Sequence, residues 1–155
     1  TKKMNNPGLI PRLDNILDKT KKFEGQGHWR SKKPMDPDKY FGFLYFIHNL
    51  QNNMYYLGCK QYKSWGRKTR NKRYGKEMTW RSYTGSCKEL NSRIRTEHHD
   101  YFWFVVIREC KTRGGLFYQE ANLQHKLDVL TKRKDGNRLF YNGNIRAVKF
   151  IPKEY

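Results

Sequence analysis

The order of apolar and polar positions along the chain predicts a β-hairpin. Two short apolar runs, residues 42–47 and 54–58, are separated by the polar residues 48–53. β-rich runs bounded by Asn-rich stretches are typical of two antiparallel strands joined by a turn. Tyr45 lies in the first run and Tyr56 in the second, so we expect two phenols on adjacent strands.

Further elements follow from the spacing of apolar residues. Residues 101–110 are apolar or aromatic through most of their length, which is typical of a central strand covered on both faces. Ser86 and Glu89 match a capping box ahead of a short helix at roughly residues 87–98. A second helix is expected from residue 116 to about residue 130. This order predicts an α/β or α+β domain on a small, mainly antiparallel sheet of three strands flanked by helices.

Glu120 interrupts the apolar stripe of that second helix. Leu116, Leu123, Leu127 and Leu130 form the stripe, and Glu120 takes its i+4 position. A carboxylate on an apolar face is costly unless it is paired, protonated or bound to a metal. One carboxylate with waters and a substrate phosphate is a usual Mg²⁺ arrangement, whereas an ordinary salt bridge at the edge of the stripe is the alternative.

The first part of the chain differs in composition from the rest. Residues 1–36 are basic and rich in Pro and Gly, and only residues 9–17 have helical spacing. We expect a basic N-terminal arm that packs on the domain or on nucleic acid, with a disordered tail as the alternative. The compact domain should then span residues 37–155.

Charge points to a polyanionic partner. The chain has 33 Lys and Arg against 14 Asp and Glu, a net charge of +19. Residues 60–81 concentrate nine basic residues with interleaved aromatics, a pattern that suits phosphate neutralisation and base stacking. A solvated loop with its aromatics in the core is the alternative. The expected nucleic-acid contacts are Lys63, Lys68, Arg70, Lys72, Arg73, Trp80 and Arg81.

Cysteine usage and hydropathy indicate the cellular compartment in which the protein is expected. Cys59, Cys87 and Cys110 form no CxxC pair, and an odd number leaves one thiol free in any disulfide scheme. This favours a reducing, intracellular compartment. The longest apolar run, residues 102–107, is too short to cross a bilayer, so no membrane partner is expected.

Several short motifs, in order along residues 40–150, resemble the GIY-YIG endonucleases, particularly phage-type members. Phe43-Leu44-Tyr45 is similar to the first motif of that family and Tyr56-Leu57-Gly58 to the second. Residues 80–86, 118–120 and 141–145 are similar to further stretches. The chain departs from the family pattern at Phe43, where the family has Gly, and in having Leu at the centre of each motif.

The resemblance implies a magnesium- or manganese-dependent endonuclease that hydrolyses phosphodiester bonds of double-stranded DNA. Glu120 would hold the metal, Tyr45 would orient or deprotonate the attacking water, and Tyr56 would contact the phosphate or assist the water. Asn142 would position the phosphate or a metal-bound water. A homing, restriction or phage DNA-processing role in a bacterial or phage-infected cytoplasm is implied, with no small-molecule substrate.

The same resemblance implies a catalytic cation shortly after the second motif. Arg67 is the most natural match, and Lys60 and Arg70 are its rivals. Such a cation would neutralise charge that develops on the phosphoryl oxygens.

Two other classes of function remain open from the residues alone. A non-catalytic basic protein that binds RNA or DNA would have the same charge and aromatics, but it gives no reason for Glu120 in an apolar stripe. A nuclease fold with a decayed site is the third possibility. Cross-strand packing is the ordinary role of hairpin tyrosines such as Tyr45 and Tyr56, and a plain turn that of Asn142.

Overall fold

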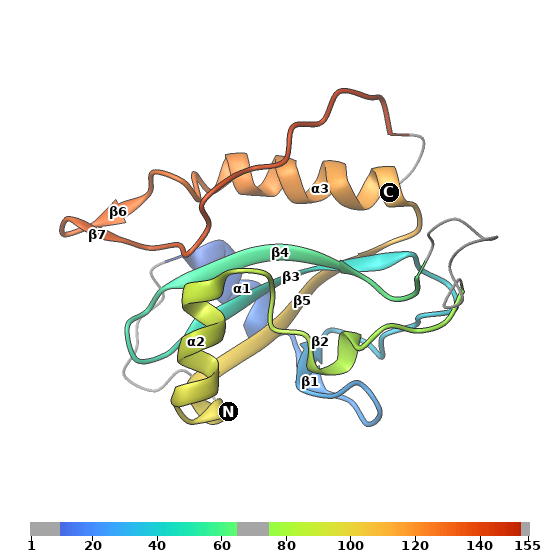
Figure 1. The fold of residues 1–155 in the computed structure, drawn as a ribbon, viewed down its shortest axis with the longest axis horizontal. Helices are drawn as coiled ribbons and strands as arrows, with labels where there is room; N and C mark the ends of the chain where they lie inside the picture. Colours follow the sequence, from blue (N-terminus) through green and yellow to red (C-terminus); the bar gives the residue numbers. More distant parts are fainter. Residues whose placement is uncertain (1–9, 65–74, 153–155) are drawn as a thin grey trace.

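A computed structural model describes residues 10–64 and 75–152 of the chain, which form an α+β fold (Figure 1). Three helices and a five-stranded mixed sheet, with a separate hairpin, make up this part. None of these helices is long and apolar enough to cross a membrane. The elements are α1 (Pro11–Asp18), β1 (Lys21–Lys22), β2 (Trp29–Ser31), β3 (Gly42–Asn49), β4 (Tyr55–Gln61), the 3₁₀ turns η1 (Trp80–Ser82) and η2 (His99–Tyr101), α2 (Lys88–Thr96), β5 (Phe102–Cys110), α3 (Arg113–Lys126), β6 (Arg133–Lys134) and β7 (Asn137–Arg138).

The predicted hairpin and third strand are three adjacent strands of the sheet, and β4 lies at its edge. β3 pairs antiparallel with β4 on one side and with β5 on the other. All of β3 is buried, and β5 lies in the middle of the order β1-β2-β5-β3-β4. The hairpin strands are longer than predicted, because His48 and Asn49 continue β3 into the stretch expected to be a turn.

The prediction of three strands was wrong, because β1 and β2 extend the sheet to five. Trp29 and Arg30 of β2 pair in parallel with Phe104 and Val105 of β5, and β1 pairs antiparallel with β2. Two strands of two or three residues leave no alternating pattern in a basic sequence. The described part of residues 1–36 thus supplies a helix and two strands to this fold.

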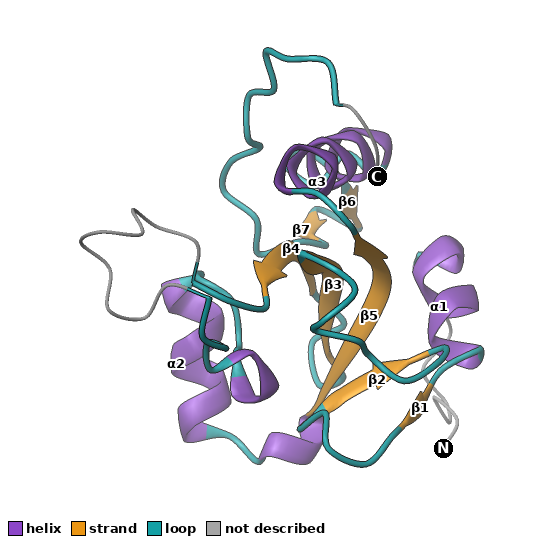
Figure 2. Cartoon of the chain, turned by 90° about the vertical axis from the view of Figure 1, so that its right-hand side faces the viewer, coloured by secondary structure: helices purple, strands orange, loops and turns teal. Residues whose placement is uncertain are grey.

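Side chains alternate between two cores, one on each face of the sheet. Leu44 and Phe46 of β3 enter a core with residues of α1 and α3. Phe43, Tyr45 and Ile47 enter the other core, which includes residues of α2 and η1. Figure 2 shows α1 and α2 on opposite sides of the sheet.

Both helices after the hairpin begin at a different residue from the one predicted. α2 has Cys87 as its N-cap, without a side-chain cap bond, so the capping box predicted at Ser86 is wrong. α3 begins before residue 116, because the hydroxyl of Thr112 accepts a hydrogen bond from Gly115 N at 2.9 Å. α3 also ends before Leu130, which is 43% exposed and does not continue the buried stripe.

The open edge of β4 is covered by the chain after β7. Tyr55 N donates to Leu139 O at 2.8 Å, and Tyr141 N donates to Tyr55 O at 2.8 Å, which makes a short parallel bridge at Phe140. An uncovered edge strand would expose unpaired backbone groups. This bridge involves one residue of β4, and a cavity opens beside the next residue, Tyr56.

Candidate active site

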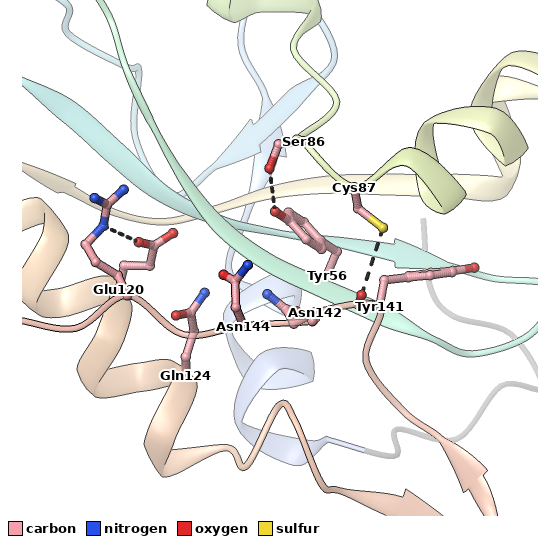
Figure 3. A pocket seen from close by; sticks show the side chains of 10 residues that line it. Tyr56, Ser86, Cys87, Glu120, Gln124, Tyr141, Asn142 and Asn144 are labelled. Carbon is pink, nitrogen blue, oxygen red and sulfur yellow. Dashed lines mark hydrogen bonds and ion pairs between the residues drawn. The ribbon is translucent and has the colours of Figure 1, made fainter.

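A cavity of about 520 Å³ lies where α3, the start of α2 and the C-terminal segment meet β4 (Figure 3). It receives side chains from elements far apart in sequence. Tyr56, Glu120 and Asn142, all predicted as site residues, line it together. The other lining residues are Ser86, Cys87, Gln124, Tyr141, Gly143, Asn144 and Arg146.

Glu120 lies on the buried face of α3, as its place in the leucine stripe predicted. It is 9% exposed, and its carboxylate accepts hydrogen bonds from the backbone and thiol of Cys59 on β4. Arg146 Nε lies 3.5 Å from Glu120 Oε1. Burial raises the pKa of Glu120, and Arg146 and then the bonds to Cys59 oppose that shift. The carboxylate is therefore partly paired and still faces the cavity.

The two tyrosines lie at different depths in the site. The hydroxyl of Tyr56 is hydrogen-bonded to Ser86 Oγ at 3.2 Å, within the cavity. Tyr45 is 1% exposed and lies beneath, with its ring centroid 6.3 Å from that of Tyr56. Burial, followed by the neighbouring Tyr56, raises the pKa of Tyr45 well above its usual value. Burial also raises the pKa of Tyr56, so both phenols are protonated donors at neutral pH.

Two glycines make room for these rings. A Cβ at Gly58, which is opposite Tyr45 on β4, would lie 2.7 Å from Tyr45 Oη and 3.1 Å from Tyr56 Cε2. A Cβ at Gly85 would lie 3.0 Å from Tyr56 Cε2. The β3–β5 register also shifts between Leu44 and Tyr45, and such irregularities often re-aim a side chain. The hydroxyl of Tyr45 therefore approaches the site through a gap that only glycine leaves open.

Asn142 is directed at the backbone of β4. Its Oδ1 accepts from Leu57 N at 3.0 Å and its Nδ2 donates to Leu57 O at 2.8 Å. Gln124 Nε2 donates to the same carbonyl at 2.9 Å. These bonds hold Tyr56, the preceding residue, against α3 and the C-terminal segment. They engage both ends of the Asn142 amide, which was expected to position a phosphate or water.

Of the predicted catalytic cations, only Lys60 falls within the described residues, and it does not line the cavity. Arg67 lies outside the described residues, as do Lys68, Arg70, Lys72 and Arg73. Lys60 lies on β4, but its Nζ sits 4.4 Å from the ring centroid of Tyr83 and does not line the cavity. Among the described lining residues, the only cation is Arg146, which the sequence analysis missed because no motif or periodicity marked it.

The described candidates for nucleic-acid contact differ in their surroundings. Lys63 forms an ion pair with the exposed Asp38 at 3.1 Å. Arg81 is paired with Glu77 at 2.8 Å and donates to Gly25 O. Trp80 is 1% exposed and its Nε1 donates to Glu77, so its ring packs in the core and is not available for stacking on a base.

The oxygen-rich donor set of the cavity fits a hard cation. Within residues 10–64 and 75–152 no group of three or more His, Cys, Asp or Glu side chains could hold a metal. Glu120 is thus the carboxylate available, and one carboxylate with waters and substrate phosphate suits Mg²⁺. Nearby, Gln124 Oε1 is buried and has no hydrogen-bond partner in the part of the chain that the structure describes. A soft metal such as zinc would instead favour sulfur and imidazole ligands.

Comparison with known families confirms the resemblance found in the sequence. Residues 26–145 match the family described as "Putative endonuclease segE, GIY-YIG domain". The match covers most of the chain, so the chain belongs to this GIY-YIG family of phage-type endonucleases. No curated protein and no solved structure matches the chain.

Proposed function

We propose that this protein is a metal-dependent endonuclease that hydrolyses phosphodiester bonds of double-stranded DNA. The observation that carries the proposal is the meeting of Glu120 and Tyr56 in one cavity at the edge of β4. A buried carboxylate that faces an open polar cavity is costly to the fold, and such groups are concentrated at functional sites.

Glu120 is the proposed ligand of Mg²⁺ or Mn²⁺. The metal would supply charge stabilisation to the phosphate and the leaving oxygen. Tyr56, with its hydroxyl held by Ser86, would donate to a phosphate oxygen or orient the attacking water. Tyr45, which is buried beneath Tyr56, would act as a second hydrogen-bond donor. Because burial raises the pKa of both phenols, neither is proposed as a general base by itself.

Asn142 and Gln124 are proposed to position the site. Their bonds to Leu57 fix the part of β4 that carries Tyr56. Reacting groups must be held within fractions of an ångström for efficient catalysis. The net charge of +19 would supply affinity for the duplex by neutralising phosphates, and this affinity should fall steeply with salt.

Nicking of a supercoiled plasmid tests the proposal. Wild-type protein should nick in the presence of Mg²⁺ or Mn²⁺ and stop when the metal is chelated. Glu120→Gln should lose at least about 100-fold in rate and keep its affinity for the duplex. Glu24→Gln makes the same change of charge at an exposed position and should cut as fast as wild type.

The rival function is binding without cleavage, which the basic composition supports equally well. Tight DNA binding by wild type with no metal-dependent nicking would favour that rival. Cleavage by Glu120→Gln at the wild-type rate would refute the assignment of Glu120 while leaving the nuclease class intact.

A further inference from the structure

We propose that Arg146 is the residue that binds the scissile phosphate in the cavity; this assignment rests on the proposed nuclease function. The resemblance to the family pointed to cations after the second tyrosine motif. Arg67 and Arg70 lie outside the described residues, and the described wall of the cavity contains a guanidinium from the C-terminal segment, close to Glu120.

Two contacts fix the guanidinium of Arg146 in place. Its Cζ lies 3.7 Å from the ring centroid of Phe117, and its Nε donates to Glu120 Oε1 at 3.5 Å. Phe117 and Glu120 are neighbours on α3. The Phe117 ring therefore packs on the plane of the guanidinium, and Glu120 binds its Nε. Arginine stacks on aromatic faces readily because its cation is planar and weakly hydrated.

The remaining donors of Arg146 are free for a ligand. Neither Nη has a hydrogen-bond partner among the described residues, and the side chain is 46% exposed. Two parallel N–H groups on a fixed plane match the oxygens of a phosphate. Tyr56, Ser86 and Asn144 line the same cavity and add hydroxyl and amide donors for the same anion.

The backbone around Arg146 is anchored on both sides. Asn142 is bonded to Leu57, and Ile145 packs against the core that includes α3. Further along, Phe150 packs on Gly114, where an added Cβ would lie 3.1 Å from the Phe150 ring. These anchors position Arg146 over α3 before any ligand binds, so little ordering cost should accompany binding.

The variants Arg146→Met and Arg146→Lys test the assignment in single-turnover nicking assays. We expect rate losses of about 100-fold or more for Met and at least 10-fold for Lys, because a point charge does not replace the guanidinium fork. Arg113→Met is the matched control, because Arg113 is exposed and lies 5.5 Å from the same Phe117 ring. It should remain within 2-fold of wild type.

Chemical rescue separates a phosphate contact from a structural role. Millimolar guanidinium should restore part of the nicking by Arg146→Ala and leave Arg113→Met unchanged. If the variants lose activity only as far as they lose thermal stability, and guanidinium has no effect, the assignment is refuted.

A binding measurement distinguishes failure of this assignment from failure of the nuclease function. The ¹⁵N–¹H signal of Arg146 Nε, identified by its loss in Arg146→Lys, should shift during titration of the full chain with inorganic phosphate. A shift without any nicking by wild type would support the phosphate site and refute the nuclease. Nicking by wild type without a shift, and with full activity of Arg146→Met, would refute the phosphate site alone.

Discussion

The side-chain amide of Asn142 pairs with the backbone of Leu57 as a neighbouring strand would, accepting from its N–H at 3.0 Å and donating to its C=O at 2.8 Å. Pairing of β4 with the C-terminal segment therefore continues past Tyr55 through a side chain. At this point a single side chain, and not a full strand, pairs with β4. The space beside Asn142 therefore stays open, and it is the cavity lined by Glu120.

Asn142→Ala should destabilise the fold and, through the looser placement of Tyr56, should also slow cleavage. The change removes two buried hydrogen bonds and leaves the N–H of Leu57 unsatisfied, at a cost of about 2–3 kcal/mol. Urea unfolding measures the loss. Asn144→Ala is the control, since Asn144 is exposed on the same segment and should change stability by less than about 0.5 kcal/mol. Wild-type stability with abolished cleavage would mean that Asn142 contacts substrate instead.

Gly58→Ala should reduce the rate of cleavage by at least about 10-fold. The reason is that a displacement of reacting groups by about 1 Å lowers the rate of a catalysed reaction strongly. The new methyl would lie 2.7 Å from Tyr45 Oη, so the buried Tyr45 ring must shift to make room for it. Single-turnover nicking measures the effect, and overpacking should also cost about 1–3 kcal/mol of stability.

Gly136→Ala is the control for Gly58→Ala. Gly136 has φ +81° with nothing within 4 Å of an added Cβ, so the change strains the β6–β7 hairpin by about 1 kcal/mol without touching the site. A variant that loses stability and keeps its nicking rate would show that stability loss alone does not explain Gly58→Ala. Equal nicking by Gly58→Ala and wild type would refute the role of the tyrosine geometry.

The elements predicted correctly from sequence were those whose periodicity is strong and local. The hairpin, β5 and α3 have long apolar runs or stripes, and Glu120 was conspicuous because it broke one. β1 and β2 could not be predicted in this way, because they form only when β5 supplies a partner far along the chain.

The roles of Asn142 and Arg146 depend on contacts that no local pattern encodes. Asn142 meets the backbone of Leu57, and a backbone group has no sequence signature. Arg146 is one of many basic residues, and only the packing of its segment on α3 brings it to Glu120. The family motif identified Asn142 as notable, but geometry was needed to indicate what it does.

Glu120→Gln should be at least as stable as wild type while losing cleavage. Burial raises the pKa of Glu120, so the ionised carboxylate is held at a cost to the fold. The amide removes that cost, and the exposed Arg146 can be solvated when its partner is lost. Thermal and urea unfolding at pH 7 measure the stability. A clear loss of stability would indicate that the carboxylate is retained for its bonds to Cys59 and Arg146.

Raising the pH from 7 to 9 should not accelerate cleavage through ionisation of Tyr45. Burial holds the pKa of Tyr45 well above 10, so the phenol stays protonated across this range. Single-turnover rates of wild type and Tyr45→Phe should therefore have parallel pH profiles, with the variant slower throughout. If the cleavage rate of wild type rises with pH and that of Tyr45→Phe does not, the donor role is contradicted and Tyr45 is identified as the base.

His28 should make stability fall as the pH drops from about 6.5 to about 4. Burial lowers the pKa of His28 to about 4, assisted by His99 and Lys22 and opposed by the bond to the Tyr83 carbonyl. Below pH 6.5 the unfolded chain takes up a proton that the folded chain does not, so up to about 3 kcal/mol is lost across this window. Urea unfolding at several pH values measures it. His28→Phe, which can still stack on Phe104, should flatten the curve, and an unchanged slope would contradict the assignment.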